Sequence, residues 1–378
     1  MQVYHFHNGG GGGVLAVISN LIQYQPEGMV SQHIIYTINQ QQHPQFEVPV
    51  IPGVASVTVF YYQPQWNFYY TCKQLAQLIP SDALLVAHDW LELAMVAMLG
   101  LPHPVVMMVH GDYAYYYDLA VKHQAQVNGY LCVAAPIESR LKTLLPQKAV
   151  HRIWFPVPDI TFSPQPFHNT TLQLLFAGRC TPEKGYDILP LIDAALRKVG
   201  IAVQWFIAGE GAAAAAAQGI WLTDANVQFL GKLPAATLYR YMQQVHGLVL
   251  PSLAEGLPVV LVEAMKAGAI VLVNDLPGGV AEVVQAPERG FTIPQNEVNG
   301  YVAAIQYLLQ HPEKAVAIQQ AAHTYVQTYF DAHRNAAAII ALLQMYARST
   351  QIRIPQKLYG SRLDQPWLPN FIVRLLRK

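Results

Sequence analysis

Two glutamates eight positions apart, Glu255 and Glu263, are the clearest candidates for chemistry in this chain. Between them runs an apolar stretch that begins with Gly256, Leu257 and Pro258. Proline suits the first turn of a helix, so we expect Glu255 in a loop and Glu263 in the following helix. A helix N-terminus offers unpaired N–H groups and partial positive charge, which favour an anion such as a diphosphate. The carboxylates would then accept hydrogen bonds from hydroxyl groups beside that anion, as in a nucleotide-sugar.

The stretch from Ser252 to Gly268 resembles the signature of retaining glycosyltransferase family 4, which has the GT-B fold and an E-x7-E motif. Further parts of the family pattern follow the same order, at Gly178-Arg179, Lys184-Gly185, Gly278-Gly279 and Glu282. The resemblance is specific mainly between residues 172 and 285, and it extends in organisation over about residues 1 to 346. It implies a fold, an activity and a role for individual side chains.

The resemblance implies that Arg179 and Lys184 neutralise the two phosphates of the donor. Glu263 would accept hydrogen bonds from the ribose hydroxyls, and Glu255 would lie beside the transferred sugar. A diphosphate leaving group gains negative charge as the glycosidic bond breaks, so fixed cations stabilise the transition state more than the ground state. The chain has no D-x-D sequence with which to hold the donor through a metal, so we expect neither a metal nor a cofactor.

Glycines and histidines complete the predicted site. Gly178 follows a predicted strand and belongs to the Gly-Arg pair of the family pattern, so the resemblance places it at the donor. Gly11 and Gly12 belong to a glycine run after the first strand, a loop that in the family approaches donor and acceptor. This run does not continue as G-x-G-x-x-G, so we reject a nicotinamide dehydrogenase. His110 ends a buried strand where the family has a histidine that contacts the donor sugar, and His88 ends another strand.

Short apolar, β-branched runs alternate with helical stretches, which predicts an α/β protein with parallel sheets covered on both faces. Strands are expected at 3–7, 33–38, 56–61, 84–87, 105–110, 129–134, 172–177, 203–208, 227–229, 247–250 and 270–273. We therefore expect the GT-B fold, two Rossmann-like doubly wound domains facing a central cleft. The expected parts are an acceptor domain at 1–158, a proline-rich linker at 159–171, a nucleotide-sugar-binding domain at 172–330, and a C-terminal helix crossing back to the first domain with a basic tail at 331–378.

Composition restricts the classes of protein to consider. The 378 residues are 53% hydrophobic and only 12% charged, which excludes a disordered chain. The formal net charge is zero, so there is no case for a nucleic-acid partner. No apolar run of 18 residues or more occurs, so we expect no transmembrane helix. The three widely spaced cysteines and the lack of a secretory leader predict a cytoplasmic protein.

The charge is uneven along the chain. From Arg348 to Lys378 there are seven Lys or Arg residues and one Asp, a local net charge of +6 that leaves −6 for the first 347 residues. The end of this tail mixes basic residues with large apolar ones such as Trp367. That mixture suits the surface of an anionic membrane, so 351–378 is a candidate for peripheral contact with its inner face. Packing of the tail on the first domain is the alternative.

We predict a retaining, metal-independent glycosyltransferase that moves a sugar from a nucleotide diphosphate donor, UDP-sugar favoured, to a hydroxyl of a glycan or lipid-linked acceptor. The product would belong to cell-surface polysaccharide or glycolipid synthesis. One alternative is a non-catalytic nucleotide-sugar-binding subunit of a glycan assembly complex. The six alanines at 212–217, which lack the charges usual at this place in the family, leave that alternative open. A nucleotide-sugar epimerase of the same fold is the other alternative.

Overall fold

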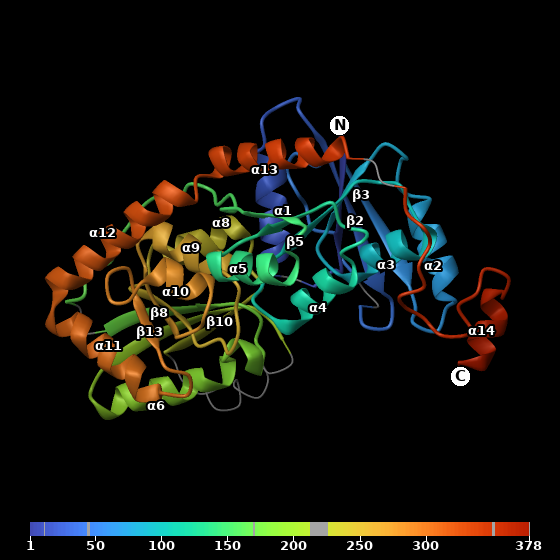
Figure 1. Cartoon of the computed structure of the whole chain (residues 1–378). Coiled ribbons are helices and arrows are strands. Elements are labelled where there is room, and N and C mark those ends of the chain that lie inside the picture. The colour runs from blue at the N-terminus through green and yellow to red at the C-terminus, as the bar shows by residue number, and fades with distance from the viewer. Residues whose placement is uncertain (11, 44–45, 169–170, 212–225, 350–351, 378) are drawn as a thin grey trace. The chain divides into compact units, whose positions relative to one another are not determined.

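The computed structural model describes residues 1–10, 12–43, 46–168, 171–211, 226–349 and 352–377 (Figure 1). The chain divides into two compact units, one made of Met1–Pro156 with His333–Lys378 and the other of Val157–Ala332. Gly11 and the alanines at 212–217 lie outside the described residues. Within the described ranges, no helix is long and apolar enough to span a lipid bilayer.

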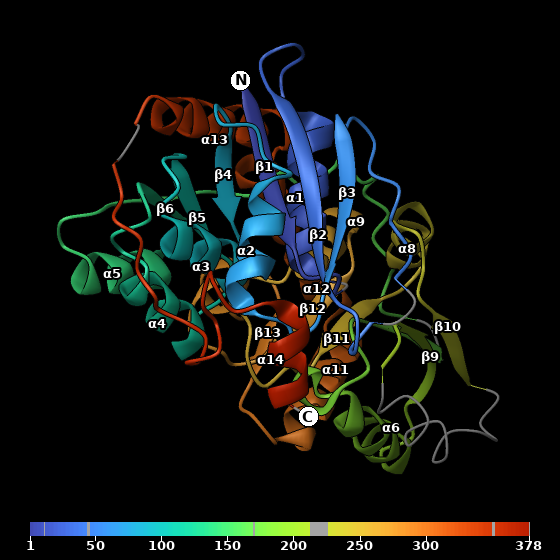
Figure 2. The same ribbon diagram turned by 90° about the vertical axis from the view of Figure 1, so that its right-hand side faces the viewer.

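The first unit contains a seven-stranded sheet in which every pairing is parallel. Its strands are β1 (Gln2–His7), β2 (Ser31–Asn39), β3 (Ser56–Tyr62), β4 (Leu84–Ala87), β5 (Val105–Val109), β6 (Gly129–Cys132) and β7 (Ala149–Arg152). Their order across the sheet is β3-β2-β1-β4-β5-β6-β7, and Figure 2 shows β3 to β6 in this sequence. The strand order reverses between β1 and β4, and in such folds ligands bind beyond the carboxyl ends of the strands at this switch point.

The helices of the first unit are α1 (Gly13–Tyr24), α2 (Phe68–Ala76), α3 (Trp90–Leu99), α4 (Ala114–Lys122), α5 (Ala135–Leu144), α13 (Ala332–Ala347) and α14 (Asn370–Leu376). Helix α3 has the best-defined ends. Asp89 and Glu92 form a capping box at its start, and Gly100 ends it with a left-handed φ of 62°. This pattern stabilises the helix that follows β4 and places Asp89 at the carboxyl edge of the sheet.

The second unit contains a six-stranded parallel sheet in the order β10-β9-β8-β11-β12-β13. The strands are β8 (Thr171–Ala177), β9 (Ala202–Ala208), β10 (Val227–Gly231), β11 (Gly247–Leu250), β12 (Ile270–Asn274) and β13 (Phe291–Ile293). The helices are η1 (Pro182–Lys184), η2 (Tyr186–Ile188), α6 (Leu189–Lys198), α8 (Ala235–Met242), α9 (Val259–Ala267), α10 (Gly279–Val284), α11 (Val298–Gln310) and α12 (Pro312–Tyr329). The central strands β11 and β12 are buried along their whole length, as continuous apolar runs in a parallel sheet require.

The prediction of two parallel α/β sheets is confirmed, and a strand is present at each predicted place. The sequence analysis missed β7 and β13. These strands have only four and three residues, and β7 ends in His151 and Arg152 rather than in an apolar run. Hydrophobic periodicity carries little signal over so short a length.

The proline-rich segment after Phe155 packs along the second unit. The Ser163 N–H donates to the carbonyl oxygen of Ala267 over 2.9 Å. The fully buried Lys266 ammonium donates to the carbonyl oxygen of Val157 over 2.8 Å and lies 3.4 Å from the Asp159 carboxylate. Buried ammonium groups need such acceptors, so these contacts tie the segment to α9.

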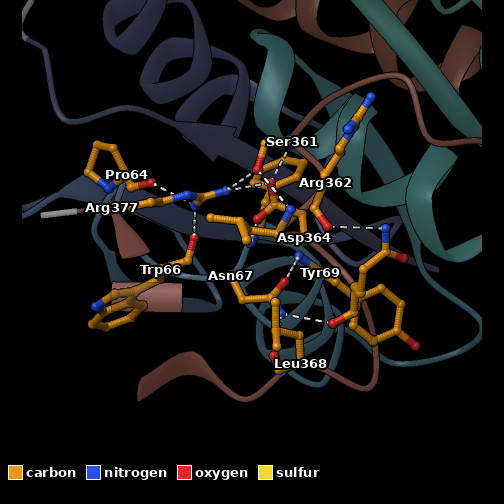
Figure 3. Close-up of polar contacts among 12 residues, drawn as sticks. Pro64, Trp66, Asn67, Tyr69, Ser361, Arg362, Asp364, Leu368 and Arg377 are labelled. Atoms are coloured by element: carbon orange, nitrogen blue, oxygen red, sulfur yellow. Dashed lines mark hydrogen bonds and ion pairs between the residues drawn. The ribbon is translucent and has the colours of Figure 1, made fainter. Parts of the chain in front are cut away.

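The tail that follows α13 is held on the first unit by two sets of hydrogen bonds. Near its start, the Arg353 guanidinium donates to the carbonyl oxygens of Leu101 and His103, each over 2.7 Å. Near its end, the Asp364 carboxylate accepts from the Phe68 N–H over 2.6 Å and from the Arg377 guanidinium over 2.6 Å (Figure 3). The tail therefore belongs structurally to the first unit.

Asp364 is the centre of the second set. Its side chain is 1% exposed, and it also accepts from the Ser361 N–H over 2.5 Å. Burial alone raises the pKa of Asp364, but the N–H groups of Ser361 and Phe68 and the Arg377 guanidinium outweigh it and hold the pKa below its ordinary value. The ionised carboxylate is therefore the form that holds the tail.

We expect Asp364→Ala to lower the free energy of unfolding by roughly 3 kcal/mol near neutral pH, because it leaves Arg377 and two N–H groups without their acceptor. Since the pKa is lowered on folding, this contribution is present above the unfolded pKa of about 3.9 and is lost as pH falls through the folded value. Urea denaturation of both proteins across acid pH measures it. Asp118→Ala, at an exposed position of α4, is the control, and an equal loss in both variants would contradict the anchoring role.

Candidate functional site

The predicted donor residues of the second unit gather at the carboxyl edge of its sheet. Gly178 and Arg179 directly follow β8, and the loop that contains Glu255 follows β11. These two strands are neighbours, and the chain proceeds from β8 outward to β9 on the other side. The point between β8 and β11 is therefore the switch point at which doubly wound sheets bind ligands.

Lys184 is placed by an unusually close approach of two backbones. Gly185 ends the η1 turn with a φ of 67°, and a Cβ added to it would lie 2.0 Å from the carbonyl oxygen of Pro251. The Leu253 N–H also donates to the carbonyl oxygen of Glu183 over 2.9 Å. The turn that carries Lys184 thus rests directly on the loop after β11, and any residue other than glycine at 185 would separate them.

This contact brings two predicted site residues together. The Lys184 ammonium lies 2.5 Å from Oε1 of Glu255, and the two side chains are 21% and 11% exposed. Arg179 is exposed at the same edge of the sheet and is not paired with either of them in the described residues. The edge therefore holds one ion pair and one further cation, which suits a ligand that carries both phosphates and hydroxyl groups.

The segment from Gly256 to Pro258 forms the entry to α9. Pro258 is the N-cap of this helix and Gly268 ends it with a φ of 99°, as the sequence predicts. The Gly279 N–H, at the start of α10, donates to the carbonyl oxygen of Gly256 over 3.1 Å. Among the described residues, the N–H groups of Gly256 and Leu257 have no acceptor. Two backbone donors at a helix N-terminus are a ready anion site.

Glu263 lies inside α9 and is 7% exposed. The Tyr239 hydroxyl, on α8, donates to its Oε1 over 2.9 Å. Burial raises the pKa of Glu263 to about 7, although the hydrogen bond from Tyr239 lowers it. A carboxyl group with this pKa is ready to ionise when further hydroxyl donors approach it, because they stabilise the charged form.

Two residues that were not predicted from the sequence support the loop that contains Glu255. The buried Asn274, the last residue of β12, donates through Nδ2 to the carbonyl oxygens of Pro251 and Ser252, each over 3.0 Å. The Tyr301 hydroxyl, on α11, donates to Oδ1 of Asn274 over 2.8 Å. The only available signal was an amide at the end of a buried apolar strand.

In the first unit, His110 follows β5 directly and is hydrogen-bonded to another histidine. Its Nε2 lies 2.8 Å from Nδ1 of His88, which follows β4, and Nε2 of His88 lies 3.1 Å from Nδ1 of His5 on β1. Burial lowers the pKa of His110 to about 3, aided by the nearby His7 and His5. These rings are therefore neutral at physiological pH.

The remaining predicted residues belong to the loop after β1. Gly12 is the N-cap of α1 with a φ of 133°, and its carbonyl oxygen accepts from the Ala16 N–H over 3.3 Å. Gly9 has a φ of 83°, and a Cβ there would lie 2.4 Å from Cδ1 of Ile38. The loop thus needs glycine at these two positions. Gly11 lies outside the described residues, so its predicted role stays a prediction.

The second unit is similar to a known protein family. Residues 159–325 match the family described as Glycosyl transferases group 1. The chain is 29% identical to glycogen synthase of Mycobacterium tuberculosis over 206 residues, which are 52% of this chain and 45% of that protein. It is 26% identical to the amylovoran biosynthesis glycosyltransferase AmsK of Erwinia amylovora over 186 residues, 47% of this chain and 45% of the relative. Each match thus spans less than half of the relative's length.

Solved structures extend the similarity to almost the whole chain. HepE of Anabaena in complex with UDP and glucose superimposes with a TM-score of 0.70 at 16% identity, covering 91% of this chain and 100% of that one. The pneumococcal O-GlcNAc transferase GtfA in complex with UDP and GlcNAc gives 0.69 at 12% identity, covering 92% and 99%. At these identities the likeness concerns the fold, which is the predicted GT-B fold.

We expect Glu263→Gln to change how stability depends on pH. The folded pKa is raised, so the stabilisation from Glu263 is complete below the unfolded pKa of about 4.3 and is lost as pH rises through about 7. Glutamine keeps an acceptor for Tyr239 and carries no charge. The variant should therefore match the wild type near pH 4 and exceed its free energy of unfolding by roughly 3 kcal/mol at pH 8.

Chemical denaturation at several pH values measures this difference. Glu313→Gln on α12, where the carboxylate is 68% exposed, is the control and should leave the pH profile unchanged. A Glu263→Gln protein that is less stable than the wild type at pH 8 would show that the buried carboxylate is held in its ionised form.

Proposed function

We propose that the chain is a retaining glycosyltransferase of family 4 type, transferring a sugar from a UDP-sugar to a hydroxyl of a glycan or lipid-linked acceptor. The observation that carries this proposal is the pairing of Lys184 with Glu255 beside the N-terminus of α9, the helix that contains the buried Glu263. A cation, two carboxylates and free N–H groups are the kinds of group that would bind a diphosphate and the hydroxyls of a sugar and a ribose.

Stabilisation of the leaving group would supply most of the catalysis. When the glycosidic bond breaks, the electron pair goes to the phosphate oxygen, and the diphosphate gains negative charge. Lys184, Arg179 and the N–H groups of Gly256 and Leu257 would bind that charge, and groups held by the fold reorganise little when it develops. Such charge-assisted hydrogen bonds contribute roughly 1.5–3 kcal/mol each.

The family resemblance suggests that the acceptor attacks on the face the leaving group departs from, with a phosphate oxygen taking the acceptor proton. The sugar would then keep its anomeric configuration without a covalent enzyme intermediate. In this scheme Glu255 orients Lys184 and contacts the sugar, and Glu263 binds the ribose hydroxyls.

The two basic side chains Lys184 and Arg179 favour a donor site that works without a metal. The sequence has no D-x-D motif, and in the described parts of the chain no group of three or more His, Cys, Asp or Glu side chains is arranged to hold a metal ion. In this proposal Lys184 and Arg179 would take the place of a metal beside the two donor phosphates. Activity in the presence of EDTA is the direct test of this part of the proposal.

The comparisons support the choice of substrates. HepE and GtfA were solved with UDP and a hexose-type sugar, which favours a UDP-sugar donor. AmsK is an amylovoran biosynthesis enzyme, which favours a polysaccharide or its precursor as the acceptor.

We expect Arg179→Ala/Lys184→Ala to weaken UDP binding by about 100-fold or more, because two charge-assisted hydrogen bonds to phosphate are lost. A thermal-shift experiment with EDTA present measures this. UDP at about 100 times its dissociation constant should stabilise the wild type by about 2.7 kcal/mol, and the same concentration should hardly stabilise the variant. GDP, ADP and CDP in parallel identify the base.

The matched control is Lys198→Ala/Arg240→Ala. Lys198 ends α6, and α8, which carries Arg240, leads into β11, so both positions lie toward the amino edge of the sheet. This variant has the same change in charge and should bind UDP as the wild type does. Binding without any sugar transfer would favour the non-catalytic subunit, and conversion of the UDP-sugar without an acceptor would favour the epimerase. No shift with any nucleotide would refute the donor site.

We also propose that the tail brings the enzyme to the cytoplasmic face of an anionic membrane. One side of α14 faces the first unit through Val373, Asn370 and Arg377. The other side presents Phe371 and Leu375, each 66% exposed. Trp367 before the helix is 74% exposed, and Arg362 and Arg374 are exposed in the same segment. Exposed aromatic and basic side chains together suit a lipid headgroup region.

We expect Phe371→Ser/Leu375→Ser to weaken binding to vesicles that contain anionic lipid by about tenfold or more, because two apolar side chains no longer enter the bilayer surface. Co-sedimentation with vesicles measures it. Deleting the whole tail would be a poorer test, since it would also remove the bonds of Arg353 and Asp364 to the first unit.

Leu191→Ser/Val316→Ser is the control for this experiment, because these two side chains are 58% and 56% exposed on the second unit. Equal binding by all three proteins would refute the membrane contact.

A further inference from the structure

A continuous chain of hydrogen bonds crosses the sheet of the first unit and ends at His110. Gln32 on β2 accepts through Oε1 from Nε2 of His5 over 2.7 Å. Nδ1 of His5 is 3.1 Å from Nε2 of His88, and Nδ1 of His88 is 2.8 Å from Nε2 of His110. At the other end, Nε2 of Gln32 donates to Oε1 of Gln25 over 2.8 Å.

Three of these side chains are deeply buried. Gln32 and His5 are 0% exposed and His88 is 4% exposed. Burial lowers the pKa of His5 to about 4, although the hydrogen bond to Gln32 raises it, and burial lowers the pKa of His88 well below its ordinary value. Each ring is therefore neutral and has one N–H and one bare nitrogen.

The Gln32 amide sets the donor-to-acceptor direction of every hydrogen bond in this series. Its N–H₂ group is used by Gln25, so its oxygen faces His5 and can only accept. Nε2 of His5 must then carry the proton, which leaves Nδ1 of His5 as an acceptor for Nε2–H of His88. By the same step, Nδ1 of His88 accepts from Nε2–H of His110. The last ring is left with a bare Nδ1.

We propose that Gln32, His5 and His88 lock the tautomer of His110, so that its Nδ1 presents a lone pair to a hydroxyl group of the substrate. The proposal rests on the proposed function and adds the chemistry of the group that His110 recognises. His110 is the residue that would touch the substrate, and the other three are positioning residues. His110 is partly exposed, and its Nδ1 has no partner in the described parts of the chain.

The fixed tautomer makes His110 selective for groups that donate a hydrogen bond. A bare Nδ1 accepts a hydrogen bond from a sugar hydroxyl, but it repels a carbonyl or phosphate oxygen, which is also an acceptor. A histidine free to exchange tautomers would bind both kinds of group. A polar site of this kind rejects analogues that lack the matching hydroxyl, because its own group would be left unpaired.

The wild-type protein tests the lock directly. With nitrogen-15 in the histidine rings, long-range nitrogen–proton NMR near neutral pH reports which ring nitrogen carries the proton. Signals are assigned by their loss in single histidine variants. We expect His5, His88 and His110 all to carry the proton on Nε2. A proton on Nδ1 of any of the three would overturn the proposal.

Variants at Gln32 test whether the amide is the cause. Gln32→Leu removes the acceptor and should mix the tautomers of His110 and lower kcat/KM for sugar transfer by about tenfold. Gln126→Leu is the matched control, since Gln126 is also buried in the first unit and bonds Gln356 instead. Unchanged tautomers in Gln32→Leu would overturn the proposal, and if that variant does not fold, the wild-type spectra still decide.

Variants at His110 test the contact with substrate. His110→Asn keeps an acceptor near the Nδ1 position, whereas His110→Gln keeps only a donor toward His88. We expect the asparagine variant to retain more transfer activity, and equal activities would overturn the proposed contact. A wild type that binds UDP but transfers no sugar would instead count against the proposed function, while the NMR result would still establish or exclude the lock.

Discussion

The close approach of Gly185 to Pro251 is the contact on which the rest of the second unit's site depends. It joins the turn after β8 to the loop after β11, and only glycine leaves room for it. The distance between Lys184 and Glu255 follows from this contact, because the two side chains come from the two joined segments. Asn274 and Tyr301 support the same loop from the neighbouring strand and helix. The ion pair is thus held by backbone packing rather than by the flexible lysine side chain.

The two units present opposite chemistry at the carboxyl edges of similar sheets. The second unit offers cations and free N–H groups, which bind anions. The first unit offers buried imidazoles, and burial keeps them uncharged. Buried carboxyl groups behave in the same way in both units: burial raises the pKa of Glu92 and of Glu263 to about 7. One physical effect, the cost of placing a charge away from water, therefore disfavours the charged form of the buried imidazoles and of the buried carboxyl groups.

The C-terminal tail packs on the first unit, which is one of the two alternatives that the sequence left open. Asp364 and Arg353 bind it to the first unit through backbone carbonyl and N–H groups. The side chains that do not take part in these bonds, among them Phe371 and Leu375, remain exposed. Packing fixes which side of α14 faces outward, since residues at helical spacing lie on one face.

The sequence by itself determined the fold class, the positions of the main strands and the ends of α9. These depend on local rules: apolar periodicity for strands, Pro258 at the start of a helix and Gly268 at its end. It also placed Glu255, Lys184 and Arg179 at one edge, because the residues that follow neighbouring parallel strands share an edge. Only the tertiary structure decided that Glu263 is buried, that Asn274 supports the Glu255 loop, and that Gln32, His5, His88 and His110 form one chain. His5 and His88 are 83 positions apart, and Gln32 and His5 are 27 apart. Such pairs meet only through the order β2-β1-β4-β5, and no pattern within a local stretch of sequence contains that order.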